Sequence, residues 1–251
     1  MDSAMDDHID DRGSAPSADA EVERVRAVYA RYYADPRTLG KWDPRNRGNA
    51  LIREELNSAI LALLTGGQVQ LGEARILDVG CGSAGTLGWL SQCGAQETRL
   101  HGVDLREEQI ELARTRYPQM HLSCADARAL PFPDRFFDVL ICNVLFSSIL
   151  DETIAKLIAA ELRRVLRPSG MIIWCDNRYG NPWNPNVRGY TPRAIRRLFP
   201  GCRIVLRSIT VVPPLVRRLG RWTSLLYPLL ACVPVLRVKY LGTIQPKAWS
   251  G

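Results

Sequence analysis

Residues 76–85 read ILDVGCGSAG, and the predicted fold class follows from this segment. A short apolar strand, residues 75–79, runs into a glycine-rich turn, and a helix is predicted from there to about Gln92. Glycines at positions 80, 82 and 85 let the backbone turn tightly and approach a ligand that side chains would keep away. The segment therefore predicts the first strand, binding loop and helix of an α/β domain.

Outward from this loop, apolar strands alternate with amphipathic helices. The predicted strands of the core cover residues 75–79, 100–104, 120–125, 137–143 and 171–175. Helices are predicted over 107–117 and 151–166, and such alternation indicates a parallel sheet with crossover helices. Two further strands, 202–212 and 238–246, fit an antiparallel edge. The expected fold is α/β: a Rossmann-like, mostly parallel seven-stranded sheet with helices on both faces and an antiparallel edge strand.

The chain divides into three parts by composition. Residues 1–20 are polar and acidic and predict a disordered tail. Residues 21–70 predict an N-terminal helical segment, with a helix ending at Asp35-Pro36, a loop over 37–49 and a second helix over 50–64. Residues 71–251 form the main domain, with an apolar and basic insertion at about 213–236.

Bulk composition excludes several protein classes. With 251 residues, 46% hydrophobic and 24% charged, the chain suits one sizeable α/β domain. No run of about 18 apolar residues predicts a transmembrane helix, and the N-terminal residues lack a signal-peptide pattern. The seven cysteines form no C-x-x-C pair, so we expect reduced thiols in a cytoplasmic protein. The three histidines show no metal-ligand spacing, so no metal site is predicted.

Charge is distributed unevenly along the chain. The net charge is +7, yet no Asp or Glu follows Asp176, whereas 13 Lys and Arg do. Two interpretations stay open: contact of the basic C-terminal third with an anionic partner or membrane surface, or a solvated basic face. For the insertion 213–236 the alternatives are an acceptor lid, a homodimer contact, a membrane-surface helix or, the one we favour, an ordinary packed insertion.

The glycine loop alone fits two kinds of cofactor site. It satisfies G-x-G-x-x-G, and Asp104 ends the second strand at the distance a dinucleotide-binding site requires. However, ILDVGCGSAG, CADARALPFPDRFFDVL (124–140) and ELRRVLRPSGMII (161–173) agree in order and spacing. Together they resemble class I methyltransferases that use S-adenosylmethionine (SAM). No Tyr-x-x-x-Lys dyad of a dehydrogenase occurs. The resemblance covers residues 75–175 and implies SAM as cofactor.

The resemblance also assigns cofactor residues, one by one. The glycine loop would line the methionine half of SAM, Asp104 would accept the ribose hydroxyls, and Asp126 with Ala127 would read the adenine edge. The implied cofactor-binding residues are Asp78, Gly80, Cys81, Gly82, Gly85, Asp104, Leu105, Asp126, Ala127, Asn143 and Phe146. An inactive SAM-fold partner subunit is the non-enzyme alternative, and the intact loop and both acids argue against it.

Aromatic residues near the N-terminus suggest a cover for this site. The helix that carries Tyr29, Tyr32 and Tyr33, with the loop at Lys41 and Trp42, precedes the first core strand. We expect this segment to fold over SAM and exclude water from methyl transfer. The alternative is a helix packed elsewhere on the sheet.

The acceptor site is expected in the loop that follows the fifth strand. Asp176 comes directly after that strand and is the predicted general base, and its alternatives are orienting the acceptor or capping a turn. Amides and aromatic rings in this loop suit a polyhydroxylated ring, although they also suit the loop's own turns. The predicted acceptor-binding residues are Trp42, Asn177, Tyr179, Trp183, Asn186 and Arg188.

A second resemblance concerns the acceptor itself. The segment NPNVRGYTPRAIRRLFPG (184–201) and KWDP (41–44) are similar to methyltransferases of bacterial polysaccharide and glycan biosynthesis. This implies O-methylation of a sugar hydroxyl in a saccharide or polysaccharide precursor. Another small molecule, such as a natural product or lipid-linked acceptor, stays open, and RNA is less favoured. The base-amino signature N/D-P-P-Y/F is absent because residues 143–146 read NVLF, so DNA is not expected.

Overall fold

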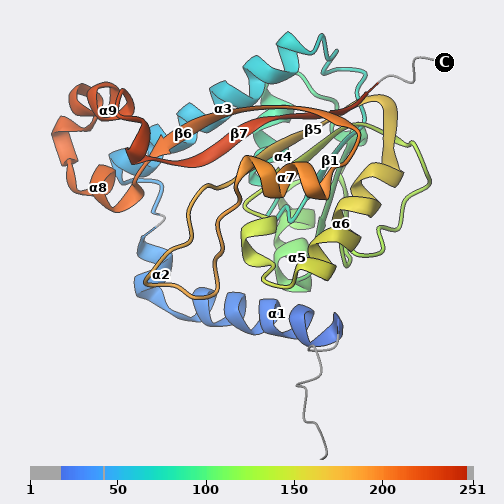
Figure 1. The fold of residues 1–251 in the computed structure, drawn as a ribbon, viewed down its shortest axis with the longest axis horizontal. Coiled ribbons are helices and arrows are strands. Elements are labelled where there is room, and N and C mark those ends of the chain that lie inside the picture. Colours follow the sequence, from blue (N-terminus) through green and yellow to red (C-terminus); the bar gives the residue numbers. More distant parts are fainter. Residues whose placement is uncertain (1–17, 42, 248–251) are drawn as a thin grey trace, which may run out of the picture.

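A seven-stranded sheet forms the centre of the computed structural model, which describes residues 18–41 and 43–247 (Figure 1). The strand order is β3-β2-β1-β4-β5-β7-β6. The first five strands along the chain are parallel, whereas β7 is antiparallel to both β5 and β6. The strands are β1 Ile76–Val79, β2 Leu100–Asp104, β3 His121–Cys124, β4 Phe137–Asn143, β5 Leu166–Asn177, β6 Cys202–Val211 and β7 Arg237–Pro246. The predicted fold class is confirmed.

Two helical layers cover the sheet and give the protein two apolar cores. One face packs against α3, α4 and α5, and the other packs against α6 and α7. Successive residues of β1 enter opposite cores, Ile76 one and Leu77 the other, so a strand buried on both faces reads as a continuous apolar run. The helices are α3 Arg47–Gly66, α4 Gly85–Gln92, α5 Glu107–Arg116, α6 Glu152–Val165 and α7 Pro192–Leu198.

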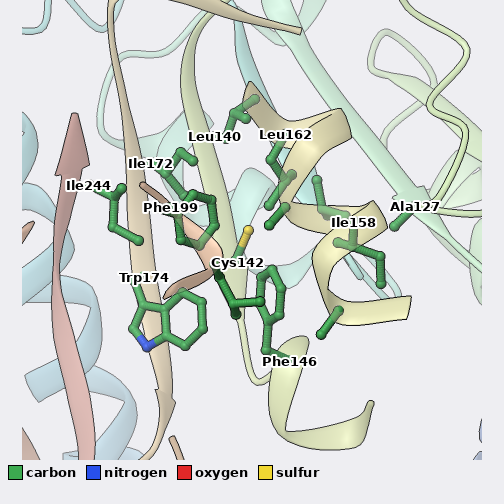
Figure 2. Packing of buried hydrophobic residues seen from close by; sticks show 14 of the residues in the cluster. Ala127, Leu140, Cys142, Phe146, Ile158, Leu162, Ile172, Trp174, Phe199 and Ile244 are labelled. Atoms are coloured by element: carbon green, nitrogen blue, oxygen red, sulfur yellow. The ribbon is translucent and has the colours of Figure 1, made fainter. Parts of the chain in front are cut away.

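Aromatic packing joins the centre of the sheet to the layer of α6 and α7. Figure 2 shows Trp174 of β5 beside Phe146, with Phe199 close by. The Trp174 and Phe146 rings stack with centroids 4.7 Å apart, and Trp174 and Phe199 meet edge to face at 6.2 Å. All three side chains are fully buried. Phe146 begins the 3₁₀ turn η2, Phe146–Ser148, so this packing fixes the chain directly after β4.

The segment predicted as a loop, residues 37–49, is partly helical in the structure. Residues 37–49 contain the end of the short helix α2, Pro36–Gly40, and the first turn of α3. The side chain of Asn46 accepts hydrogen bonds from Gly48 N and Asn49 N, and therefore starts α3 earlier than its apolar pattern indicates. The predicted fifth strand, residues 171–175, is too short, because β5 begins at Leu166 and its register against β4 shifts before Met171.

The predicted N-terminal helical segment divides into two parts with different roles. Helix α3 belongs to the core, since Ile60 and Leu64 are fully buried against the sheet. Helix α1, Ala18–Ala34, is separate from this layer, and Figure 1 shows the loop after β5 extending toward it. Only α1 is therefore placed to cover a site at the carboxyl ends of the strands. The predicted tail, residues 1–20, lies mostly outside the described residues.

The insertion 213–236 forms short helices between β6 and β7. It contains α8 Pro213–Arg218, the 3₁₀ turn η3 Gly220–Trp222, α9 Thr223–Ala231 and the 3₁₀ turn η4 Pro234–Leu236. Val216 and Tyr227 pack with Ile52 of α3 in a small third core. Figure 1 shows α8 and α9 at one end of the β6–β7 pair. Within the described ranges, no helix is long and apolar enough to cross a bilayer.

Gly242 is a stringent test of the sheet order, because it lies in β7 between Trp174 of β5 and Leu206 of β6. A Cβ at this position would overlap the carbonyl oxygen of Val205, which is backbone and cannot rotate away. We expect Gly242→Ala to lower the free energy of unfolding by about 3 kcal/mol or more.

The matched control is Gly66→Ala at the end of α3, where an added Cβ would meet nothing within 4 Å. Urea denaturation of both variants measures the effect. Equal unfolding midpoints for the two variants would contradict the close approach of β6 and β7.

Candidate functional site

A cavity of about 330 Å³ opens at the carboxyl ends of β1, β2 and β4, beneath α1. Ligands of open α/β sheets bind at this edge. The wall combines segments that are far apart in sequence. It consists of Glu21, Val22, Val25, Arg26, Tyr29, Tyr33, Val79, Gly80, Cys81, Gly82, Ser83, Val103, Asp104, Leu105, Arg106, Ala125, Asp126, Ala127, Asn143, Val144, Leu145, Ser148, Ile149, Ile154 and Ile158.

The glycine loop forms one side of the cavity with its backbone. Gly80 and Gly82 have positive φ angles of 79° and 52°, which side chains rarely adopt. The N–H groups of Gly80 and Cys81 both donate to the carbonyl oxygen of Val103, at 2.8 and 3.0 Å, and fold the loop back onto β2. Gly85 opens α4 and is not on the wall. Burial raises the pKa of the Cys81 thiol, so this side chain stays uncharged.

Asp104 joins three parts of the cavity. Its Oδ2 accepts a hydrogen bond from Gly82 N at 2.9 Å, and its Oδ1 accepts from the Arg106 N–H and Nε, both at 3.1 Å. The Arg106 guanidinium lies over the rings of Tyr29 and Tyr33, at 5.0 and 4.5 Å from their centroids. The carboxylate at the end of β2 thus connects the glycine loop, the start of α5 and helix α1.

The second predicted acid, Asp126, also lies on the cavity wall. Its Oδ1 accepts from Arg128 N at 2.8 Å and its Oδ2 from Arg128 Nε at 2.7 Å. Arg128 reaches in addition to Asp19 of α1 at 3.0 Å. Leu105 and Ala127 line the wall beside the two acids. The geometry therefore brings together the residues that the sequence assigns to the ribose and adenine portions of a nucleoside.

Helix α1 supplies wall residues of two kinds: Tyr29 and Tyr33, which belong to the expected cover, and others such as Glu21, which the sequence did not assign to the site. The Glu21 Oε1 accepts from Leu150 N at 2.6 Å, and Arg24 donates to Ser148 O at 2.6 Å. Farther along the helix, the Tyr29 hydroxyl and Ser148 Oγ are 2.8 Å apart. The pKa of Tyr29 is raised because its ring is buried. These bonds hold α1 against the segment after β4. The tyrosines at helical spacing were the feature of the sequence that indicated such a cover.

Two buried acceptors behind the loop lack a partner among the described residues. The Asp78 Oδ1 and the Asn143 Oδ1 each have no hydrogen bond. Burial, and then the charge of Asp104, raise the pKa of Asp78 to about 7. Asn143 is on the cavity wall, whereas Asp78 lies behind it. Because buried polar groups are normally paired, these acceptors suit a ligand that brings donors to this end of the cavity.

Asp176 is not placed as the sequence predicts. It lies within β5 rather than after it, opposite Tyr240, and its side chain is 1% exposed. Its Oδ2 accepts from Ser147 N at 3.0 Å and its Oδ1 from Asn177 N at 2.8 Å. The residue is absent from the cavity wall. Burial raises the pKa of Asp176, and these two bonds oppose the rise.

The loop after β5 packs outside the cavity. None of its predicted acceptor residues is on the wall, and Trp183 is 90% exposed. The loop is nevertheless adjacent to the site, because the Asn186 Oδ1 is 3.4 Å from Arg24 Nη1 and Arg188 N donates to Ser147 O. The residues concerned are Asn177, Tyr179, Trp183, Asn186 and Arg188.

The structure corrects the assignment of Phe146 and does not describe Trp42. Phe146 is fully buried against Trp174 and is absent from the cavity wall, because its ring completes the aromatic core. Trp42 lies outside the described residues. Across residues 18–41 and 43–247, no group of three His, Cys, Asp or Glu side chains is arranged to hold a metal ion.

Comparison with known proteins gives the same interpretation as the geometry. Residues 76–170 match the family model of a methyltransferase domain. The chain is 31% identical over 146 residues to O-methyltransferase cnsE of Penicillium expansum, covering 55% of this chain and 50% of that one. It is 33% identical over 129 residues to a fatty-acid O-methyltransferase of Mycolicibacterium smegmatis, covering 50% and 46%. The chain thus spans about half the length of the curated relatives it matches.

The fold is shared with solved structures at low sequence identity. A SAM-dependent methyltransferase from Methanosarcina mazei superposes with a TM-score of 0.55 and 18% identity, over 73% of this chain and 96% of that one. This similarity concerns the fold alone, whereas the family match indicates methyl transfer as the chemistry of the domain. Together they confirm the predicted cofactor. Residues 76–170 thus match a methyltransferase domain whose cofactor is S-adenosylmethionine.

Proposed function

We propose that this chain transfers the methyl group of SAM to an oxygen atom of a small organic acceptor. One observation carries the proposal. The glycine loop, Asp104 and Asp126 come from separate segments, and they line a single cavity closed by α1. The names of two relatives, both O-methyltransferases, support oxygen as the atom methylated.

The cavity residues fit the parts of SAM in order. The carboxylate of Asp104 would accept the ribose hydroxyls, Asp126 and Ala127 would contact the adenine, and the backbone at Gly80 and Gly82 would lie along the methionine portion. The unpaired oxygens of Asp78 and Asn143 suit an ammonium group at that end, reached directly or through water. When bound, SAM supplies an electrophilic methyl group.

Arg106 must shift for a ribose to bind in this way. Its Nε now donates to Asp104 Oδ1, one of the two oxygens that a ribose would use. Its guanidinium can stay over Tyr29 and Tyr33 while releasing the carboxylate, because cation–π contact does not depend on that bond. Ribose hydroxyls would thus replace one charged donor by two neutral ones.

The chain contributes to the transfer mainly by positioning. Methyl transfer is an in-line displacement, so holding the acceptor at the correct angle provides much of the rate. Helix α1 and its bonds from Glu21 and Tyr29 to residues 148–151 keep water from the cavity. In this arrangement Asp176 is a positioning residue: it holds Ser147 and with it the segment that carries Ser148 on the wall.

Two acceptor classes are favoured by different observations. The exposed rings of Tyr179 and Trp183, on a loop rich in amides, support a sugar hydroxyl beside the cavity. A lipid carboxyl or hydroxyl is supported by the fatty-acid O-methyltransferase among the relatives. The sugar is the acceptor expected from the sequence, and the lipid is the second candidate.

The first test measures cofactor binding and turnover together. Wild-type protein should form S-adenosylhomocysteine with at least one acceptor from a panel of oligosaccharides, hydroxylated lipids and fatty acids. Asp104→Ala removes two hydrogen bonds to a charged group, each about 1.5–3 kcal/mol, so SAM should bind about 100-fold more weakly or worse.

Calorimetry gives the affinity, and Glu108→Ala on the exposed side of α5 is the matched control, expected to leave it unchanged. An unaltered dissociation constant in Asp104→Ala would contradict the cofactor placement. A methylated nitrogen or carbon in the product would overturn the proposed oxygen acceptor.

The second test separates positioning from proton abstraction at Asp176. Asp176→Asn keeps the shape and removes both the charge and one acceptor for a backbone N–H, so we expect the free energy of unfolding to fall by about 1–3 kcal/mol. With the acceptor from the panel, kcat should fall less than tenfold. Loss of more than about 100-fold in kcat at unchanged SAM affinity would restore Asp176 as the general base.

The third test uses pH and the burial of Asp78. Its pKa is about 7 in the folded protein, against about 3.9 in an unfolded chain. A raised folded-state pKa stabilises the fold below about pH 4, and this contribution, up to about 4 kcal/mol, is lost as pH rises through about 7. In SAM-free protein, Asp78→Asn should therefore gain stability relative to wild type as pH rises from about 5 to about 8.

Denaturation curves at both pH values measure this difference. Glu108→Gln, on the exposed side of α5, is the control, and its stability relative to wild type should be the same at both pH values. If the difference in free energy of unfolding between Asp78→Asn and wild type does not change with pH, burial does not raise the pKa of Asp78.

A further inference from the structure

The insertion 213–236 carries an unusual share of the protein's exposed apolar surface. Of twelve large hydrophobic side chains exposed in the described part of the chain, six belong to these residues, so the surface is concentrated rather than scattered. They are Leu215, Trp222, Leu225, Leu229, Val233 and Val235.

Helix α9 is apolar on both of its faces. Thr223 and Tyr227 are buried and hold the helix against the body of the protein. Leu225 and Leu229, one turn apart, are each 64% exposed on the other side. The helix, TSLLYPLLA, contains no charged residue. A helix that is apolar all round is normally buried in protein or in lipid, so its outer face lacks its usual environment.

Cations border this apolar face, and the insertion itself contains no acid. Arg218 and Arg221 are exposed at the end of α8 and before α9, and the Arg221 guanidinium lies 5.1 Å from the Trp222 ring centroid. No Asp or Glu occurs after Asp176 in the sequence. Glu55 of α3, an acid that contacts the insertion, accepts hydrogen bonds from the Tyr227 hydroxyl and Thr210 N inside the protein.

We infer that the insertion docks the protein on an anionic lipid bilayer, with the α9 side chains among the acyl chains and the arginines at the phosphates. Leucine and tryptophan on one face with arginines at its border are the composition of interfacial helices. Each arginine near an anionic surface contributes about 1 kcal/mol to binding. The inference stands on this surface alone and does not depend on the proposed acceptor.

Charge decides between a bilayer and a second copy of the chain. A two-fold dimer through this face would place the same patch on both sides, so the interface would contain four arginines, Arg218 and Arg221 from each copy, and no acid from the insertion. A bilayer with anionic headgroups supplies both the apolar interior and the negative charge. It therefore complements both properties of the surface.

The insertion lies next to the loop that follows β5, and this fixes how a docked protein would be oriented. Arg178, the first residue after β5, donates its backbone N–H to Val238 O, and its Nη1 donates to Pro234 O and Arg237 O. The insertion is thus bonded to the start of the loop that borders the cavity. A docked protein would present this edge of the sheet, rather than the opposite one, to the membrane.

Vesicle sedimentation tests the inference with full-length protein. Wild type should bind vesicles of phosphatidylcholine with phosphatidylglycerol, bind phosphatidylcholine alone far more weakly, and lose binding as salt rises. The double variant Leu225→Ser with Leu229→Ser should bind the anionic vesicles at least about tenfold more weakly. Arg218→Gln and Arg221→Gln should each weaken binding about fivefold and reduce its salt dependence.

The matched control is Leu112→Ser with Leu157→Ser, two exposed leucines on α5 and α6, which should bind vesicles like the wild type. Unchanged SAM affinity in every variant shows that the fold is intact. Three results would overturn the inference: no binding to anionic vesicles at low salt, equal binding by the α9 variant, or an α9-dependent dimer or RNA complex without vesicle binding.

Discussion

The carboxylate of Asp104 is the contact on which the site depends. Through Gly82 N it fixes the turn of the glycine loop, and through Arg106 N it fixes the residue directly before α5. The Arg106 side chain then extends this network to the two tyrosines of α1. Since the residue is nearly buried, each of these bonds acts in a low dielectric and is stronger than its surface equivalent. One side chain thereby sets both the floor and the cover of the cavity.

Helix α1, which covers the cavity, is held by hydrogen bonds of its side chains to the segment after β4. Glu21 and Tyr29 bond to the segment after β4, whose own position comes from Phe146 packed on Trp174 and from Asp176 bonded to Ser147. Residues that lie outside the cavity therefore determine its shape. This explains how Asp176 can matter to the site without touching a ligand.

The sequence predicted the sheet, and it singled out several residues that line one side of the cavity, because both follow from local patterns. Strands buried on two faces read as apolar runs, and Gly82 and Asp104 lie at strand ends that a parallel sheet brings to one edge. Phe146 and Asp176 were misplaced for the opposite reason. Their positions depend on packing against Trp174 and on a backbone N–H of Ser147, contacts between distant elements that no spacing reveals. Arg106 was also missed, although a cation two residues after Asp104 is close enough along the chain to pair with that carboxylate. Motif matching does not consider such pairs.

The reversed strand β7 imposes an order on folding. It is the last strand of the sheet in sequence, yet it lies between β5 and β6, which precede it. During synthesis, β5 therefore emerges with one unpaired edge, and β6 emerges with no strand partner, until residues 237–246 follow. Such edges are where newly made chains associate wrongly. Pairing of β5, β7 and β6 is thus the folding step that we expect to depend most on chaperones and on the speed of translation.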